Sequence, residues 1–532
     1  MPAAQPEEVY DVAVAGLGPV GQMVALILGQ QGHRVLCLEK HPEPYPLPRA
    51  VHFDPDVSRL LDWVGVSDEI ATFSEPALVY EWQNADRKTL LRFTFPEQGD
   101  QGWYGSSMFN QPGLEDSLRG RAAQLPSLTI WNGAELTDFT QDDDGVNLTI
   151  DRNGIPHTAR AQFLVGSDGA NSFVRSHLGV EVNDLGFFYR WLIVDFQPTE
   201  PMSFEPANLQ VCDPRRPVSS VSGGPGHRRF EFMEMPSDDP ETFDTDENAW
   251  ALMADWGVTP QNATLERRRL YQFQSRWAKQ WRHGRVFLAG DAAHQVPPFY
   301  GQGLVSGVRD SVNLAWKLDL VLRGAAEQSI LDSYDSERGA QVQFTIMMSV
   351  ELGRVICQLD PNEVAGRDAH FLEHGPDPMT ALPPMPPERC GPGLFPGREP
   401  DKIADCAGVL AVNGNVTFAG ERSDLFDRKA YGKFQLIVDG EKVSEDALRA
   451  ILEITPAGVE VVPVRILPAG STPTPGSCEA TDDDDRYLPW LRASNDVARI
   501  VRPDFYTYAP AKTLEEIAEL LTGLRSTLHL TQ

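Results

Sequence analysis

Three glycines near the start of the chain have the spacing of a phosphate-binding turn. Gly16, Gly18 and Gly21 form a G-x-G-x-x-G pattern. An apolar run typical of a buried parallel strand precedes them at residues 9–15, and apolar spacing typical of a helix follows at residues 23–30. In such a turn the first glycine allows the bend, the second lets the backbone approach a pyrophosphate, and the third lets helix and strand pack closely. The pattern predicts a dinucleotide site, although other glycine turns between a strand and a helix can share it.

An acidic residue follows the next apolar run at the position of a ribose ligand. The run covers residues 34–38, and Glu39 comes about 20 residues after the last glycine of the pattern. A carboxylate at this place accepts hydrogen bonds from ribose hydroxyls. We therefore predict that Glu39, with its neighbour Lys40, binds the cofactor. These residues alone do not distinguish FAD from NAD.

Two further motifs stand at the ends of apolar runs. Asp168 opens a D-G-x-x-S-x-x-R motif after residues 161–165, and Asp291 lies in a G-D-A-A-H-x-x-P-P motif after residues 285–289. Ligands of α/β proteins collect at the carboxyl ends of parallel strands, so both aspartates are predicted at the ligand edge of one sheet. The alternative for the first motif is a turn that caps a helix beginning near Ser172.

A pair of prolines and a glycine-rich segment complete the third motif. Pro297 and Pro298 can neither continue a strand nor sit inside a helix, which predicts a stiff loop. Gly301 and Gly303 then open a predicted helix that runs to Leu318. The positive end of its dipole is suited to the edge of a flavin where negative charge gathers on reduction.

The order of the three motifs resembles that of the FAD-dependent aromatic hydroxylases of the para-hydroxybenzoate hydroxylase fold, the group A flavoprotein monooxygenases. The resemblance includes GQGLVSGVRDSVNLAWKL (residues 301–318) and SYDSERG (residues 333–339) and covers the chain nearly end to end. Other stretches are similar to the 3-(3-hydroxyphenyl)propionate hydroxylases within this family. They are CDPRRPVSSV (residues 212–221), RRFEFMEMP (residues 228–236) and VRPDFYTY (residues 501–508).

The resemblance implies roles for individual residues. Arg49 and Gln111 match residues that contact FAD, and Asp291 matches one that binds the ribityl chain. Pro298 would line the side of the isoalloxazine where oxygen reacts, and Arg229 would help to move the flavin between two positions. The alternative for Arg229 is an exposed residue of an edge strand. The predicted cofactor-binding residues are Gly16, Gly18, Gly21, Glu39, Lys40, Arg49, Gln111, Asp168, Asp291, Gly301, Gly303 and Leu304.

The resemblance does not identify the residue that deprotonates a phenol. The family prototype has a tyrosine two residues beyond the flavin-moving arginine, whereas Glu231 stands here, so the prototype's phenol contact cannot be transferred. The candidates for this role, each equally explained as a packed residue, are Tyr104, Tyr189, His294 and Tyr300. The predicted catalytic residues are Pro298, His294, Arg229 and Tyr104, and no metal site is predicted.

The implied reaction is the hydroxylation of a phenolic compound, similar to 3-(3-hydroxyphenyl)propionate, through a flavin C4a-hydroperoxide. O2 and either NADH or NADPH would be consumed, and FAD would perform the chemistry. One alternative is a polyketide-tailoring flavin monooxygenase that carries out hydroxylation or Baeyer–Villiger oxidation of a polycyclic aromatic. A more distant alternative is a flavin-binding sensor without catalytic activity.

Charge and composition favour a cytoplasmic enzyme. The 532 residues include 46 basic and 76 acidic ones, and the net charge of −30 repels a nucleic-acid backbone. The first residues do not form a basic region followed by an apolar one, and no apolar run approaches the roughly 18 residues that span a bilayer. The six cysteines lack C-x-x-C and metal-ligand spacing, which favours reduced thiols. We expect a small phenolic partner, no nucleic acid and no membrane.

The predicted fold class is α/β, with a Rossmann-like FAD-binding domain and an inserted antiparallel-sheet substrate domain. The C-terminal part resembles the thioredoxin-like C-terminal domain of the phenol hydroxylase subgroup, which implies a C-terminal thioredoxin-like domain. The length of the chain is suited to two or three domains. The FAD-binding domain is expected to be discontinuous, at residues 1–75, 105–186 and 285–375. Residues 76–104 and 187–284 would form the substrate domain.

The last third of the chain is predicted as a linker followed by a separate domain. Nine prolines at residues 376–400 indicate the linker. Residues 401–532 alternate strands and helices without C-x-x-C, so packing or a homodimer is favoured over disulfide exchange. The acidic run at residues 482–485 is interpreted as a solvated loop. The expected strands are residues 433–438, 459–466 and 498–501, and the expected helices are residues 444–452 and 514–524.

Overall fold

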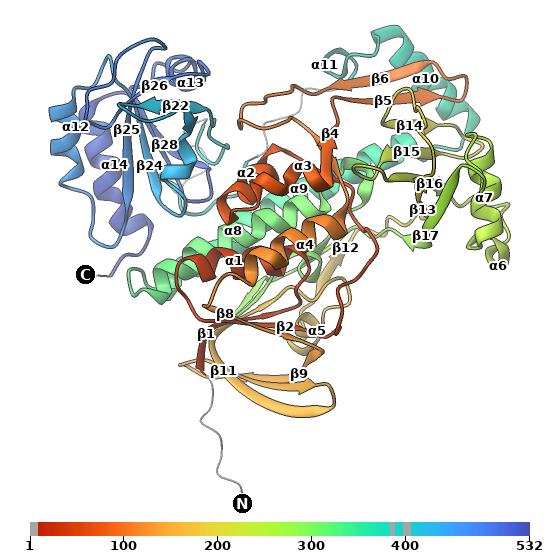
Figure 1. The fold of residues 1–532 in the computed structure, drawn as a ribbon, viewed down its shortest axis with the longest axis horizontal. Helices are drawn as coiled ribbons and strands as arrows, with labels where there is room; N and C mark the ends of the chain where they lie inside the picture. Colours follow the sequence, from red (N-terminus) through yellow and green to blue (C-terminus); the bar gives the residue numbers. More distant parts are fainter. Residues whose placement is uncertain (1–8, 383–388, 397–405, 532) are drawn as a thin grey trace, which may run out of the picture.

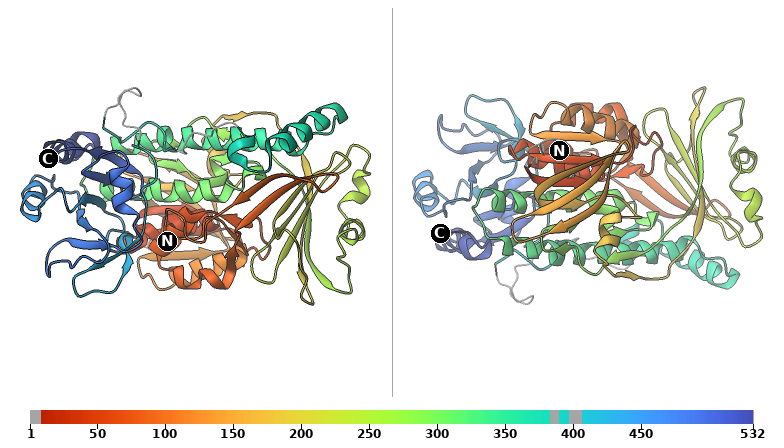
Figure 2. Two further views of the ribbon diagram at one scale, coloured as in Figure 1. Left: turned by 90° about the horizontal axis from the view of Figure 1, so that it is seen from above. Right: turned by 90° about the horizontal axis from the view of Figure 1, so that it is seen from below.

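Three large sheets follow one another along the longest axis of the molecule (Figures 1 and 2). The computed structural model describes residues 9–382, 389–396 and 406–531. The sheet that contains the first strand lies in the middle, and the sheets built within residues 79–272 and 415–511 lie at opposite ends. Among the described residues, no helix combines the length and the apolar character needed to cross a bilayer.

The central sheet is largely parallel, as its apolar segments predict. Its main strands in spatial order are β19 (Arg282–His283), β20 (Val286–Leu288), β11 (Ile155–Gly166), β1 (Val9–Ala15), β2 (Val35–Glu39) and β8 (Leu128–Asn132). The strands from β20 to β8 pair in parallel, which confirms the four parallel strands expected from the sequence. β11 begins earlier than expected because its first half pairs with β10 (Val146–Arg152), which also pairs with β9 (Ala134–Gln141).

Helices α1 (Pro19–Gln30), α4 (Gln111–Ala122) and α8 (Gly303–Leu322) pack around the central sheet. α1 is buried on nearly every side because α4 and α8 both pack against it. The helix expected from Gly301 begins two residues later, at Gly303. A 3-10 turn at Pro298–Tyr300 precedes it, and Gly301 ends that turn with a φ of 66°, which is incompatible with a right-handed helix.

The second large sheet, called here the inserted sheet, is antiparallel except for one pair. In spatial order it contains β17 (Ala263–Gln272), β13 (Arg190–Pro198), β16 (Arg228–Met233), β15 (Val218–Ser222), β14 (Leu209–Cys212), β5 (Val79–Asn84) and β6 (Thr89–Thr94). The pair β14–β5 is parallel, and it joins two segments that lie more than a hundred residues apart in the chain. All seven strands lie within residues 76–104 and 187–284.

The two faces of the inserted sheet bury different clusters. Phe230 and Phe232 of β16 pack with residues of helices α6 (Pro240–Phe243) and α7 (Asp246–Ala254). The other face carries Trp191, Ile193 and Met233, which belong to a cluster with Ile356 at the end of α9 (Ser333–Ile356). This alternation follows the two-residue period of a strand. The second face is therefore turned towards the central part of the chain.

The third large sheet lies at the C-terminal end of the chain. In spatial order its strands are β23 (Asp424–Leu425), β22 (Asn415–Phe418), β26 (Glu479–Asp482), β25 (Val461–Leu467), β24 (Phe434–Asp439), β27 (Ala498–Val501) and β28 (Thr507–Ala511). Helices α12 (Glu445–Leu452), α13 (Tyr487–Arg492) and α14 (Leu514–Thr527) accompany it. β24, β25, β27, α12 and α14 are the five elements that the sequence predicted.

Shorter elements connect these layers. Two small sheets contain β3 (His52–Phe53), β7 (Ser107–Phe109) and β4 (Ser74–Pro76) in one case, and β12 (Val182–Asp184), β18 (Arg276–Ala278) and β21 (His294–Gln295) in the other. The remaining helices are α2 (Pro55–Val64), α3 (Ile70–Phe73), α5 (Phe173–His177), α10 (Pro361–His374) and α11 (Pro378–Ala381).

A buried ionic cluster joins the C-terminal part to the central helices. Arg502, just after β27, donates to Glu337 of α9 at 2.7 Å and to Asp504 at 2.5 Å, and Lys317 of α8 donates to Glu337 at 2.8 Å. The Lys317, Glu337 and Arg502 side chains have no exposed surface. Although burial alone would raise it, the charges of Arg502 and Lys317 hold the pKa of Glu337 well below its usual range. The C-terminal part is therefore fixed to the helices of the central layer.

Two sequence interpretations in this region need correction. The expected linker at residues 376–400 lies partly outside the described residues, but Cys390, Leu394 and Phe395 are buried, and the Leu394 N–H donates to Glu337 at 2.7 Å. This part of the segment is core and not a free linker. The acidic run is only partly solvated, because Asp482 is 1% exposed and accepts backbone N–H groups at the start of α13.

Replacing Arg502 by methionine should lower the free energy of unfolding by about 3 to 5 kcal/mol, because Glu337 then stays buried with an incomplete set of partners. Urea denaturation followed by fluorescence measures the change. Lys433→Met is the control: it breaks an ion pair of the same class with Glu460 whose side chains are 42% and 63% exposed, and about 0 to 1 kcal/mol is expected. In the native chain the Glu337 contribution is complete above pH ~4.3 and is lost as the pH falls below it. Equal losses in the two variants would contradict the role of the buried cluster.

Candidate functional site

The glycine turn between β1 and α1 has one open position and two crowded ones. Gly16 has a φ of 94°, and an added Cβ at Gly21 would stand 2.0 Å from the Gly16 carbonyl oxygen. A Cβ at Gly18 would have nothing within 4 Å. Gly18 is also the N-cap of α1 and offers no side chain to the free N–H groups of the first turn. The turn therefore combines open space with unsatisfied donors, which suits an anion such as a pyrophosphate.

Glu39, at the end of β2, lies against this turn. One of its carboxylate oxygens accepts the Leu17 N–H at 3.0 Å, and the other accepts the His41 N–H at 2.9 Å. The neighbouring Lys40 is exposed. The carboxylate is thus placed beside the glycine turn, where the sequence predicted a ribose ligand.

The end of β11 brings Asp168 to the same turn. An added Cβ at Gly16 would approach the Asp168 Cα to 2.8 Å, so the two backbones touch. One oxygen of Asp168 accepts the Val174 N–H at 3.0 Å, and Ser172 caps α5 by accepting the Arg175 N–H at 2.9 Å. The structure therefore confirms the alternative given for this motif, a turn that caps a helix beginning near Ser172. The second oxygen of Asp168 is buried without a partner among the described residues, so it is free to accept a hydrogen bond from a ligand.

The third motif approaches the start of α1 from β20. Gly290 has a φ of 60°, and an added Cβ there would stand 3.0 Å from the side chain of Val20. Asp291 follows with an exposed side chain that makes no hydrogen bond within the described part of the chain. All three motifs thus meet around the first turn of α1. This convergence joins segments that lie more than a hundred residues apart in the sequence.

His294 does not reach this open region. Its Nε2 lies 2.7 Å from Asp310 of α8, Arg338 donates to the other oxygen of Asp310 at 2.8 Å, and these side chains have no exposed surface. Trp281 stacks on the imidazole with ring centroids 5.2 Å apart. The ring is held in the protein interior by Asp310 and Trp281, and its catalytic role stays a prediction. His294 fixes the loop between β20 and α8, and its partner Asp310 was not predicted from the sequence.

The proline loop packs against the inserted sheet. Ser349 of α9 donates to the Pro297 carbonyl at 2.6 Å. Pro298 is half-buried, and the next residue, Phe299, meets Trp191 and Phe273 with ring centroids 5.8 and 5.7 Å away. The loop that the sequence predicted beside a flavin therefore borders an aromatic face of the inserted sheet.

A short segment at residues 48–50 is bound by the inserted sheet on one side and by helix α4 on the other. Arg229 of β16 donates to the carbonyls of Arg49 at 2.8 Å and Pro48 at 3.1 Å, and Arg267 of β17 also donates to Pro48. From the other side, the buried Gln111 accepts the N–H groups of Arg49 at 3.0 Å and Ala50 at 2.8 Å. The edge-strand alternative for Arg229 is wrong, since this side chain is 3% exposed and lies on an inner strand.

The acidic partner of these arginines was not predicted. Asp195 of β13 accepts two hydrogen bonds from Arg229, at 2.6 and 3.1 Å, and lies 3.7 Å from Arg267. A single charged residue inside the apolar run WLIVDF was the available signal. Burial of a carboxylate is costly without paired charges, so Asp195 and the arginines stabilise one another.

The remaining predicted residues are spread around the site. The Arg49 guanidinium lies over the Tyr45 ring at 4.7 Å and is exposed, and Leu304 packs half-buried against the central core. Tyr104 is 44% exposed in the loop before β7, and Tyr189 packs on Phe187. The structure does not bring these two tyrosines together with Asp168 or Asp291 through any contact among the described residues.

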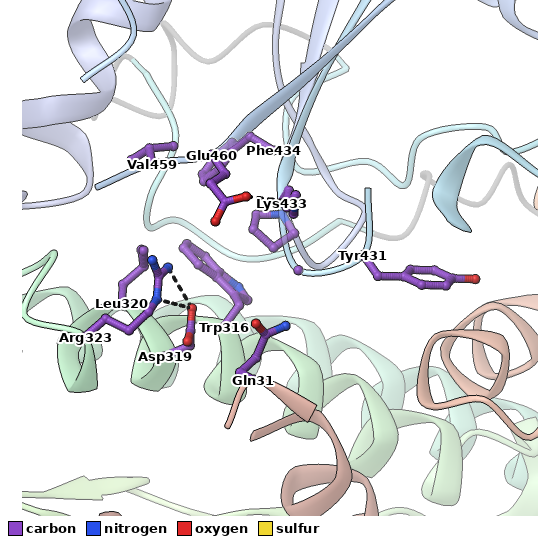
Figure 3. A pocket seen from close by; sticks show the side chains of 12 residues that line it. Gln31, Trp316, Asp319, Leu320, Arg323, Tyr431, Lys433, Phe434, Val459 and Glu460 are labelled. Atoms are coloured by element: carbon purple, nitrogen blue, oxygen red, sulfur yellow. Dashed lines mark hydrogen bonds and ion pairs between the residues drawn. The ribbon is translucent and has the colours of Figure 1, made fainter. Parts of the chain in front are cut away.

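A separate cavity of about 80 Å³ lies where α8 meets the C-terminal sheet (Figure 3). Trp316, Asp319 and Arg323 line it from α8, and Lys433 and Glu460 line it from the C-terminal part. Its charges are paired, since Arg323 binds Asp319 at 2.8 Å and Lys433 binds Glu460 at 2.8 Å. It contains none of the motif residues and belongs to the contact between the two layers.

Comparison with known proteins identifies the cofactor machinery. Residues 9–349 match the FAD binding domain family. A probable NADH-specific resorcinol 4-hydroxylase of Rhodococcus jostii (strain RHA1) is 35% identical, over 98% of this chain and 96% of that protein. A 3-(3-hydroxy-phenyl)propionate/3-hydroxycinnamic acid hydroxylase of Escherichia coli (strain K12) is 30% identical, over 97% of this chain and 95% of that protein.

A solved structure has the same architecture from end to end. The ternary complex of aklavinone-11 hydroxylase with FAD and aklavinone matches with a TM-score of 0.77 and 25% identity. The match covers 98% of this chain and all of that chain.

Two glycine substitutions should separate binding from folding. Gly18→Ala should fold, because the Cβ meets no atom and φ is −65°, yet FAD affinity should fall at least tenfold, or ~1.4 kcal/mol, because the methyl group blocks the pyrophosphate approach. Gly21→Ala should instead destabilise the apoprotein by about 1 to 3 kcal/mol through the clash with Gly16. Thermal melting and FAD absorbance after reconstitution measure both effects. Wild-type FAD affinity in Gly18→Ala would show that the turn does not hold the cofactor.

Proposed function

The chain belongs to the family of FAD-binding aromatic hydroxylases, and on that premise we propose that it hydroxylates a small phenolic compound of the 3-(3-hydroxyphenyl)propionate type. FAD is its cofactor, and NADH or NADPH supplies the reducing equivalents. The two curated relatives named above support a single-ring substrate by their names, since both are named for one-ring phenols.

The contact between the proline loop and the inserted sheet carries this proposal. Phe299 follows Pro298 directly and packs on Trp191 and Phe273. A ring bound beside Pro298 would therefore rest among aromatic side chains, which bind planar rings and exclude water. Water exclusion matters because it strengthens every charge interaction with the ring.

The residues around the glycine turn fit FAD. The unpartnered oxygen of Asp168, the open space at Gly18 and the uncapped start of α1 are the features that a dinucleotide would use. We assign Glu39 to the ribose and Asp291 to the ribityl chain. When bound, FAD supplies the electron transfer from the nicotinamide and the activation of O2. The chain positions the ring, and Arg229 and Gln111 hold the segment that borders the cofactor.

A polyketide-tailoring activity is the second candidate. The shared fold with aklavinone-11 hydroxylase favours it, because that protein is solved with aklavinone bound. Product analysis after incubation with simple phenols and with fused-ring quinones distinguishes the two. Turnover of only the fused-ring compounds would replace our first proposal with the second.

The C-terminal part takes a structural role in this proposal. We assign residues 401–532 to a thioredoxin-like domain that packs on α8 and α9. This domain takes no part in disulfide exchange, and it offers a surface for a homodimer. All six cysteines are free, and burial raises the pKa of the Cys478 thiol to about 12, which makes it a poor nucleophile. Free thiols are also typical of the reducing cytoplasm, where we place the protein.

An oxygen-uptake assay tests the proposed reaction. A hydroxylatable phenol should accelerate NADH or NADPH oxidation strongly and give product close to the oxygen consumed, because an ungated flavin would waste reductant as peroxide. A non-hydroxylatable analogue should accelerate oxidation and release hydrogen peroxide. Oxidation rates that are equal with and without every phenol tested would contradict a substrate-gated hydroxylase.

Replacing Arg229 by alanine tests the bound segment at residues 48–50. The variant loses two hydrogen bonds to this segment, each of about 1.5 to 3 kcal/mol, and two to Asp195, so we expect flavin reduction to slow at least tenfold. The dissociation constant of the phenol should change less. Stopped-flow absorbance measures reduction, and Arg269→Ala, an exposed arginine on β17, is the control. A variant defective only in phenol affinity would place Arg229 in the substrate pocket instead.

A further inference from the structure

We infer that Glu231 accepts the proton of the phenol hydroxyl during ring hydroxylation. This inference rests on the proposed function, and it supplies the base that the sequence comparison left without a residue. Its basis is the place of Glu231 in the inserted sheet, its lack of hydrogen-bond partners, and an unsatisfied donor on the neighbouring strand.

Glu231 lies on the face of the inserted sheet that borders the proline loop. Strand residues alternate between faces, so Glu231 shares its face with Arg229 and Met233 on β16. Arg229 reaches the segment at residues 48–50, and Met233 belongs to the cluster that contains Phe299. The cross-strand partner of Glu231 on β13 is Ile193, a member of the same cluster. The carboxylate is therefore placed between the flavin-bordering segment and the aromatic face.

The carboxylate of Glu231 is largely buried and has no hydrogen-bond partner within the described residues. Its side chain is 14% exposed, and the closest cation, the Arg229 guanidinium, is 3.8 Å away, which is too far for a hydrogen bond. Within the described residues no hydrogen bond reaches the Glu231 side chain. Arg229 instead uses its donors on Asp195 and on the carbonyls of residues 48 and 49. Both oxygens of Glu231 are thus available to a ligand.

One further polar atom near Glu231 lacks a partner. The indole N–H of Trp191 is buried without an acceptor among the described residues. Trp191 lies on β13, two residues from Ile193, the cross-strand partner of Glu231, and belongs to the same cluster as Phe299 and Met233. Buried donors are normally satisfied, so an unsatisfied one on the strand beside this carboxylate indicates a ligand that brings its own oxygen atom. A hydroxylated aromatic ring has this chemistry.

Burial raises the pKa of Glu231, against the opposing charges of Arg229 and Arg267. A higher pKa makes the carboxylate a stronger base, closer to the pKa of about 10 of a phenolic hydroxyl. In the proposed step the phenol O–H bond breaks, the proton forms a new O–H bond on Glu231, and the electron pair stays on the phenolate oxygen. The titratable and charged groups near Glu231 are Arg229, Asp195, Arg267, Tyr271 and Tyr80.

The test compares Glu231→Gln with Glu266→Gln, in which the same change is made on β17 at a glutamate paired with His227. With resorcinol, which is neutral at assay pH, turnover of the FAD-loaded Glu231→Gln variant should fall at least 100-fold. With 4-nitrophenol, assayed at a pH where it is already ionised in solution, turnover should fall less than tenfold. Glu231→Asp should recover part of the resorcinol activity, and Glu266→Gln should behave like wild type.

An optical titration tests the same inference without turnover. When 4-nitrophenol binds the FAD-loaded wild type below its own pKa, part of the bound probe should show the yellow phenolate band, because Glu231, whose pKa is raised by burial, takes a share of the proton. In Glu231→Gln the bound probe should stay colourless, while FAD content stays equal to that of wild type. Equal losses with both phenols, or a phenolate band in Glu231→Gln, would overturn the assignment. A wild type that forms the band but hydroxylates no phenol would instead refute the proposed function.

Discussion

A buried carboxylate between two arginines holds the inserted sheet and the central layer in one arrangement. Asp195 lies on the strand between Arg229 and Arg267, and both arginines also donate to the carbonyl of Pro48. A guanidinium removed from water must find acceptors for its N–H groups, or burial costs several kcal/mol. The segment at residues 48–50 supplies these acceptors. Its position is consequently set by the charges of a sheet to which it does not belong.

Helix α8 connects the proline loop to the C-terminal layer through two further sites of buried charge. Its 20 residues span about 30 Å and begin directly after the proline loop. Asp310, in the middle, fixes His294 and Arg338, and Lys317, near the end, enters the ionic cluster with Glu337. Both sites are buried charges that can exist only with their partners in place. Helix α8 therefore adjoins the candidate site at its N-terminal end and the C-terminal layer at its C-terminal end.

The parts of the structure that the sequence predicted are those fixed by neighbours in the chain. The roles of Gly16 and Gly21 follow from a strand and a helix that adjoin them, so the spacing of the glycines was enough to predict the turn. The pairing of His294 with Asp310 was not predicted because Asp310 comes from another element, and no local pattern records that pairing. Arg267 was missed for the same reason. The buried residues near Cys390 were hidden by prolines, which mark a backbone without regular structure but not its exposure.

The parallel pairing of β5 with β14 sets an order of events during synthesis. β5 and β6 leave the ribosome early, whereas β14 follows on the order of 10 seconds later at ordinary elongation rates. Until then β5 presents an unpaired edge to the cell, and unpaired edges recruit other strands. The partly formed sheet of the nascent chain must therefore avoid pairing with strands of other proteins until β14 has been synthesised. The lag shortens with elongation rate, so slower translation exposes the edge for longer.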